Sequence, residues 1–313
     1  MKKTLLATTL LVATAGLAAA DTGVTLNGYG RFGLVYTDDG TTSDTVIHTR
    51  LRFNINAVTE TDSGLTFGGR IRMQHTSGGD AFGTGEGAAE LNAAMLYMES
   101  GGFRVEVGNA NTAYDSAGLY YNSEIGFTDN SLGESQDFEF YGYSSGPYGA
   151  AEVERMGLFA SYSVGDLTGR ISYVDPDQTA SGDDPEVSIS IDYASGPFSV
   201  SLAAAQDGAG IAGNDLFFIG AAYAIGDSTN VGLNYYDEDE DKITTLYANH
   251  TMASGLTVAG YVSDLDDGVA ATEDDIGLGI GASYPLGEGV KMSGAYHKRG
   301  DVAYADFGVR FDF

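Results

Sequence analysis

The stretch IHTRLRFNIN at positions 47–56 decides how this chain is expected to fold, because its residues alternate between apolar and polar types at every position except Thr49. The apolar phase holds Ile47, Leu51, Phe53 and Ile55, and the polar phase holds His48, Arg50, Arg52, Asn54 and Asn56. A period of two is typical of a β-strand whose two faces meet different surroundings. The stretch therefore predicts a strand that carries two arginines on its polar face.

The same alternation runs through most of the chain on both sides of this strand. Extended to the last residue, it predicts sixteen strands, at 24–36, 47–56, 65–74, 90–99, 103–109, 155–164, 167–174, 186–194, 198–205, 215–225, 230–236, 242–251, 256–263, 276–284, 290–297 and 302–313. Short glycine-bearing turns alternate along the chain with mostly longer polar loops. An antiparallel barrel with an even number of strands has such a division, with short turns on one rim and loops on the other. A soluble β-sandwich has no reason to segregate its connections in this way.

The beginning of the chain predicts export. It opens MKK, continues with an apolar run over 5–17 and reaches AAA at 18–20, a pattern that is typical of a secretory signal peptide. The run is shorter than the ~20 residues that a membrane-spanning helix needs. We expect residues 1–20 to be cleaved before Asp21 and residues 21–313 to form a single barrel domain.

Composition limits the partners and the chemistry. Without the leader, 13 basic side chains stand against 44 acidic ones, and the net charge of −31 would repel the phosphates of a nucleic acid. The chain has no cysteine, and its four histidines are not spaced with serine and aspartate as in a catalytic triad. We therefore expect no nucleic-acid partner, no enzyme and no cofactor.

Nine of the ten arginines fall in predicted strands, and all nine lie on the polar phase. They are Arg31, Arg50, Arg52, Arg70, Arg72, Arg104, Arg155, Arg170 and Arg310. An arginine facing lipid near the membrane midplane would cost about 2–4 kcal/mol. The expected fold is therefore an all-β, transmembrane antiparallel β-barrel of sixteen strands, with the apolar face in lipid and the arginines in the lumen. Outward tyrosines would form interfacial girdles: Tyr36, Tyr97, Tyr162, Tyr173, Tyr193, Tyr223, Tyr284 and Tyr296.

Five arginines crowd into the first three predicted strands, and an acidic segment can face them. The five are predicted to line one sector of the pore wall: Arg31, Arg50, Arg52, Arg70 and Arg72. Segment 109–154 alternates poorly and is too long for a structureless connection in a compact domain, which favours a functional loop. As the third loop on the outer rim it could fold into the pore and constrict it. Its candidate constriction residues are Asp115, Glu124, Asp129 and Glu134.

Other acidic residues gather in the predicted outer loops, at 183–184, 237–241 and 264–267. Solvated surface charge is the plain interpretation. Loosely bound Ca²⁺ that bridges to anionic outer-membrane lipid is the functional alternative, because Ca²⁺ prefers carboxylate ligands. The run at 237–241 lacks the glycine of an EF-hand loop, so no defined metal site is predicted.

Four stretches together resemble the trimeric general-diffusion porins of Gram-negative outer membranes, especially those of purple photosynthetic bacteria. They are VTLNGYGRFG at 24–33, RLRF at 50–53, RVEVGN at 104–109 and the C-terminal FGVRFDF at 307–313. The resemblance covers essentially the whole mature chain. It implies a homotrimer in contact with outer-membrane lipid and lipopolysaccharide, with arginines facing an acidic third loop.

The resemblance also implies a function and a route of insertion. The function is passive diffusion of small hydrophilic solutes and ions through a water-filled channel, and the alternative is an outer-membrane channel specific for a sugar or an anion. The C-terminal strand would be the signal that the outer-membrane assembly machinery reads, through Phe307, Val309, Phe311 and Phe313.

Overall fold

The computed structural model describes residues 23–78, 89–135, 139–149, 154–179, 184–238, 241–267 and 275–313. Its elements are β1 (Gly23–Asp38), β2 (Ser43–Glu60), β3 (Thr66–Ser77), β4 (Glu90–Leu91), β5 (Met95–Ser100), β6 (Phe103–Gly108), β7 (Met156–Val164), β8 (Leu167–Asp175), β9 (Glu186–Ser195), β10 (Phe198–Gln206), the 3-10 helix η1 (Gly208–Gly210), β11 (Leu216–Ile225), β12 (Thr229–Glu238), β13 (Asp241–Thr251), β14 (Thr257–Asp266), β15 (Ile276–Gly287), β16 (Val290–Arg299) and β17 (Val302–Asp312). The predicted signal peptide at 1–20 and Asp21 lie outside the described residues. No helix in the described ranges is long and apolar enough to cross a membrane.

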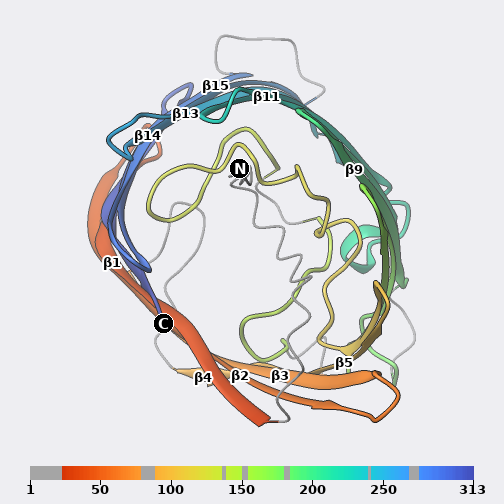
Figure 1. The fold of residues 1–313 in the computed structure, drawn as a ribbon. Coiled ribbons are helices and arrows are strands. Elements are labelled where there is room, and N and C mark those ends of the chain that lie inside the picture. The colour runs from red at the N-terminus through yellow and green to blue at the C-terminus, as the bar shows by residue number, and fades with distance from the viewer. Residues whose placement is uncertain are drawn as a thin grey trace.

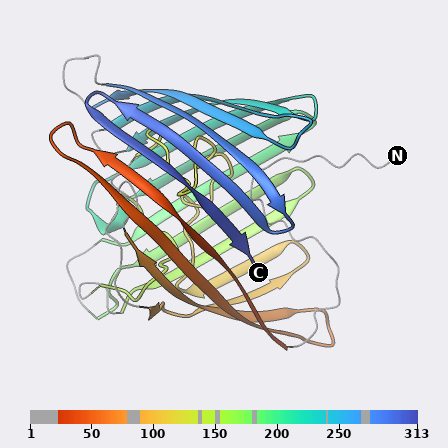
Figure 2. The ribbon, with the colours of Figure 1, turned by 90° about the vertical axis from the view of Figure 1, so that its left-hand side faces the viewer.

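The strands form one closed antiparallel sheet. Apart from β4 and β5, neighbours in sequence pair with each other, and β1 also pairs with β17, from Tyr29 opposite Asp312 to Asp38 opposite Ala303. Because β4 and β5 both pair with β3, they are two parts of one interrupted strand. The predicted barrel of sixteen strands is thereby confirmed, and its strands run obliquely around a common interior (Figures 1 and 2).

The apolar face of the sheet points outward, as the arginine pattern predicted. Along β9, Val187, Ile189 and Ile191 are 41–51% exposed, whereas the intervening Ser188 and Ser190 are 1% exposed. A soluble barrel would show the reverse, with its apolar side chains packed inside. The outer surface is therefore suited to hydrocarbon.

The interruption between β4 and β5 changes the direction in which one tyrosine, predicted to face outward, points. Leu91 is 57% exposed on the outer face, but Leu96 is 61% exposed as well, although the two have opposite parity. Met73 of β3 is opposite Leu91, and Arg70 is opposite Met95. The chain thus advances three residues on β3 but four on the facing strand, and this one extra residue exchanges its inward and outward positions. Tyr97 therefore faces inward, and its expected place in an outer girdle is wrong.

Some connections also differ from the predicted ones. β12 and β13 pair up to Glu238 opposite Asp241, so only residues 239–240 separate two strands where a loop over 237–241 was expected. By contrast, the connection between β6 and β7 is the longest in the chain, and its described parts lie within the ring of strands (Figure 1). Its tyrosines Tyr114 and Tyr120 pack with Phe218 and Tyr236 in a buried cluster on the inner side of the wall.

Candidate functional site

The connection from Asn109 to Arg155, here called the inner segment, is fixed to the wall through its backbone. The amides of Ala113 and Tyr114 donate to the hydroxyls of Ser172 and Ser188, at 2.8 Å and 3.1 Å. The next contact along the wall is made by Asp192, whose Oδ1 accepts from the amide of Gly118 at 3.0 Å. Inward serines and carboxylates therefore supply the partners that a buried irregular backbone requires.

The later part of the inner segment is held in the same way by β13 and β14. The hydroxyl of Thr245 donates to the carbonyl of Gly133 at 2.6 Å, and that of Ser263 donates to the carbonyl of Leu132 at 2.9 Å. The amide of Leu132 donates to the hydroxyl of Tyr261 at 2.6 Å. Residues 113–118 and 132–133 of the inner segment are thus tied to strands that lie far from them in sequence.

The tip of the inner segment is held by Asp306 of β17. The amides of Phe127 and Thr128 donate to this carboxylate at 2.8–3.0 Å, and the amide of Ala295 on β16 donates to it at 2.9 Å. Gly126 precedes these amides with a φ of +95°, and a Cβ there would lie 2.6 Å from Asp306 Oδ1. The turn at the tip therefore requires both the glycine and the carboxylate.

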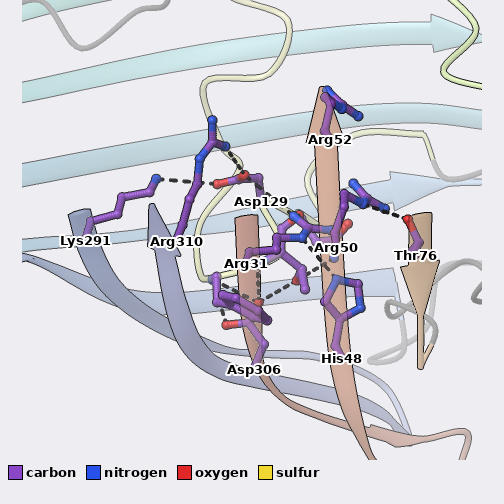
Figure 3. A network of polar contacts seen from close by, with 12 residues as sticks. Arg31, His48, Arg50, Arg52, Thr76, Asp129, Lys291, Asp306 and Arg310 are labelled. Carbon is purple, nitrogen blue, oxygen red and sulfur yellow. Dashed lines mark hydrogen bonds and ion pairs between the residues drawn. The ribbon is translucent and has the colours of Figure 1, made fainter. Parts of the chain in front are cut away.

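Asp129 follows the tip directly and lies among three cations of the wall (Figure 3). Its carboxylate is 3.9 Å from Arg31 Nη1, 3.6 Å from Arg310 Nη1 and 3.9 Å from Lys291 Nζ. The side chain of Asp129 remains 36% exposed. One acidic group of the inner segment is thus held against a basic part of the wall.

The sheet register explains why these cations lie together. Arg31 is opposite both Arg310 and Arg50, and Lys291 is opposite Arg310. Closure of the barrel thus sets four cations in one row across β16, β17, β1 and β2. Like charges this close repel unless water or a counter-charge separates them, and Asp129 supplies the counter-charge.

Three members of the row have further polar contacts, among them Arg310, whose Nη2 donates to Asp312 Oδ1 at 2.8 Å. Arg31 is 3% exposed; its Nε donates to His48 Nε2 at 3.0 Å, and its Nη1 donates to the Thr128 carbonyl at 3.0 Å. Arg50 Nε donates to Thr76 Oγ1 at 3.1 Å. Arg31 thus also supports the tip of the inner segment from β1.

The other predicted wall arginines face a different part of the inner segment. Arg52 Nε donates to Gln74 Oε1 at 2.6 Å, and Arg72 Nη1 donates to Ser145 Oγ at 2.7 Å. The guanidinium carbons of Arg70 and Arg72 lie 4.1 Å and 4.6 Å from the ring centroid of Tyr143. These arginines are thus held by neutral groups and an aromatic face.

The remaining predicted acidic residues lie elsewhere on the inner segment. Asp115 accepts a hydrogen bond from the Tyr121 hydroxyl and lines a cavity with Arg70 and Arg72. Glu124 lines another cavity with Asp129 and Lys291. Glu134 is 7% exposed. Desolvation raises the pKa of all three carboxyls. The negative charge of Glu134 raises the pKa of Glu124 further, and that of Glu238 raises the pKa of Glu134 further.

The sequence did not predict Lys291 or Tyr143 as site residues, and it did not predict that Arg310 belongs to the row of wall cations. The polar phase of Arg310 was visible, but its position beside Arg31 follows from closure of the sheet. Tyr143 carried no periodic signal because it lies outside the strands.

The C-terminal candidates lie on β17 or directly after it. Phe307, Phe311 and Phe313 are 37–56% exposed, and Val309 shares the outward phase. In the described part of the chain, no group of three or more acidic or histidine side chains is placed to hold a metal ion. Of the acidic loop residues, Asp183, Asp239 and Glu240 lie outside the described residues.

Comparison with known proteins agrees with this architecture. The family model for Gram-negative porins matches residues 7–309. A relative named Porin from Fuscovulum blasticum is 41% identical over 300 residues, which are 93% of this chain and 100% of the relative. The structure of a mutant of the Rh. blastica porin superimposes with a TM-score of 0.85 at 41% identity, covering 93% of this chain and 100% of the other. A further structure, titled "Asymmetric conductivity of engineered proteins", gives the same values.

Proposed function

The chain belongs to the family of Gram-negative porins, and on that premise we propose that its cation row and inner segment together form the constriction of the channel. Membership makes the protein an integral outer-membrane β-barrel and a channel for passive diffusion, not an enzyme. The comparisons do not favour a channel dedicated to one sugar or anion. The solutes are small, hydrophilic molecules and ions.

The position of Asp129 among Arg31, Arg310 and Lys291 carries this proposal. Asp129 and the cation row thus bring charges of both signs to the inner side of the wall. Fixed charges that line a narrow aqueous passage create a local field, which orders water and favours polar solutes over apolar ones of equal size. In this proposal Arg50, Arg52, Arg70 and Arg72 extend the basic wall, and Asp115, Glu124 and Glu134 belong to the segment that narrows the passage.

Planar-bilayer recording tests the constriction. A double variant Arg50→Ala, Arg52→Ala removes two wall cations, so the reversal potential in a KCl gradient should shift toward cations. The shift should be larger at 0.1 M salt, where the Debye length is about 10 Å, than at 1 M, where it is about 3 Å. The matched control is Lys242→Ala, Lys298→Ala, which removes two cations that are exposed at strand ends outside the row. If both double variants behave alike at low salt, the arginines do not line the constriction.

The proposed assembly follows the family. The porin works as a homotrimer, contacts outer-membrane lipid and lipopolysaccharide, and loses residues 1–20 before the assembly machinery reads its last strand. Cross-linking in native membranes that yields only monomers would contradict the trimer, and N-terminal sequencing that finds Met1 would contradict cleavage. Loosely bound Ca²⁺ at acidic outer loops belongs to the same proposal, and ⁴⁵Ca²⁺ retention by purified protein tests it.

A further inference from the structure

The wall arginines differ in their counter-charges. Arg31 and Arg310 lie beside Asp129. Arg70 and Arg72, on β3, have no carboxylate oxygen of a described residue within 4.0 Å. Two adjacent cations on one strand face thus lack an acidic partner in the described chain.

Their hydrogen bonds are also incomplete. Arg72 donates through Nε to Asn54 Oδ1 at 3.0 Å and through Nη1 to Ser145 Oγ at 2.7 Å, so both acceptors are neutral. The guanidinium of Arg70 donates to no described residue, and its Nε is buried without an acceptor. Planar guanidinium groups present several N–H donors, and a buried donor without a partner costs about 1–3 kcal/mol. The arrangement therefore calls for an acceptor that the described residues do not supply.

A cavity of about 460 Å³ lies against these two arginines. Tyr143 lines it and holds both guanidinium groups against its ring, which fixes them for recognition. Asp115 also lines the cavity, but desolvation raises the pKa of its carboxyl, which disfavours the charged form. The volume falls within the ~300–1,000 Å³ that is usual for small-molecule sites.

We propose that this cavity is a subsite for a small dianionic oxyanion of the phosphate type, bound by Arg70 and Arg72. Two guanidinium groups match the charge of a dianion and the several acceptor oxygens of a tetrahedral group, which chloride lacks. The inference rests on the proposed function, because the anion reaches the cavity from the channel. The subsite enriches such anions in an open channel and does not restrict the channel to them.

Inorganic phosphate is the probe, and the experiment has two readouts on the full-length protein. ³¹P line broadening with detergent-solubilised porin reports binding, and phosphate added to planar bilayers at low KCl reports a saturable decrease in current. Arg70→Gln and Arg72→Gln should each weaken both effects about tenfold, the loss expected for one charge-assisted hydrogen-bonding partner. Arg70→Lys keeps the charge without the planar fork and should retain only part of the affinity.

Arg104→Gln is the matched control, because Arg104 lies in β6 on the inner face but is already paired at 2.6 Å with Glu99 and at 2.7 Å with Glu106. Its phosphate response should equal that of the wild type. A conducting wild-type channel without saturable phosphate binding overturns the subsite and leaves the channel function intact. An equal loss in Arg104→Gln also overturns it, since general positive charge would then explain the effect. Phosphate binding without any conductance would instead overturn the channel function.

Discussion

Asp306 should hold the tip of the inner segment, and replacing it with Asn should loosen that tip. Asn keeps the volume but removes the charge and turns one acceptor oxygen into a donor, so the Thr128 amide loses a partner that now lies 2.8 Å away. A hydrogen bond to a charged group contributes about 1.5–3 kcal/mol, which corresponds to roughly 10- to 150-fold in an opening equilibrium. Amide exchange at Phe127 and Thr128 should accelerate by that factor.

Hydrogen exchange with mass spectrometry on peptides covering 120–135 measures the effect. Asp301→Asn is the control, since it makes the same change of charge in the exposed turn between β16 and β17. Conductance should respond in parallel, because Asp129 directly follows the tip and would lose its fixed position beside Arg310. Unchanged exchange at the tip in Asp306→Asn would refute the anchoring argument, whatever happens to the current.

Three further perturbations test the same region. Asp129→Asn should shift the reversal potential toward anions at 0.1 M salt and much less at 1 M, where screening is stronger; a shift independent of salt would contradict it. Burial raises the pKa of Glu134 in the folded protein above its pKa of about 4.3 in the unfolded chain. The contribution of this group to folding stability is therefore fully present below about pH 4.3 and is lost as the pH rises through the higher pKa of the folded state. The melting temperature of the wild type should therefore fall relative to that of Glu134→Gln between pH 4 and 8. A difference in melting temperature that does not change with pH would contradict this prediction. Gly126→Ala, at a φ of +95°, should lower stability by about 1 kcal/mol or more and alter conductance, whereas Gly149→Ala, with nothing within 4 Å, should do neither.

The strands were predictable because each is a local pattern with an outside and an inside. Alternation at positions 47–56 placed β2, and the arginine phase oriented the whole sheet, since lipid does not tolerate arginine. Tyr97 shows where this local reasoning fails. One extra residue between Leu91 and Met95 exchanges the two faces, and within 95–100 Glu99 is the one charged residue on the phase of Tyr97 that points to the exchange.

The path of the inner segment could not be predicted for a different reason. Its length and acidity were visible, but its course depends on partners more than fifty residues away, such as Ser172, Ser188 and Asp306. Each of these looks like any other polar residue of an inward phase. Only the closed sheet determines which of them lie opposite a given amide of the segment.

The same geometry explains why counting charges does not give the field in the channel. The mature chain would carry −31, yet Asp115, Glu124 and Glu134 lie where desolvation favours their protonated forms, and Asp306 is occupied with backbone amides. Asp129 is the half-exposed carboxylate that faces the row of Lys291, Arg310 and Arg31. Arg70 and Arg72 add two cations without a carboxylate partner among the described residues. The wall near the inner segment therefore has a basic sector, opposite in sign to the chain as a whole, because three of the four predicted carboxyls of the segment are desolvated.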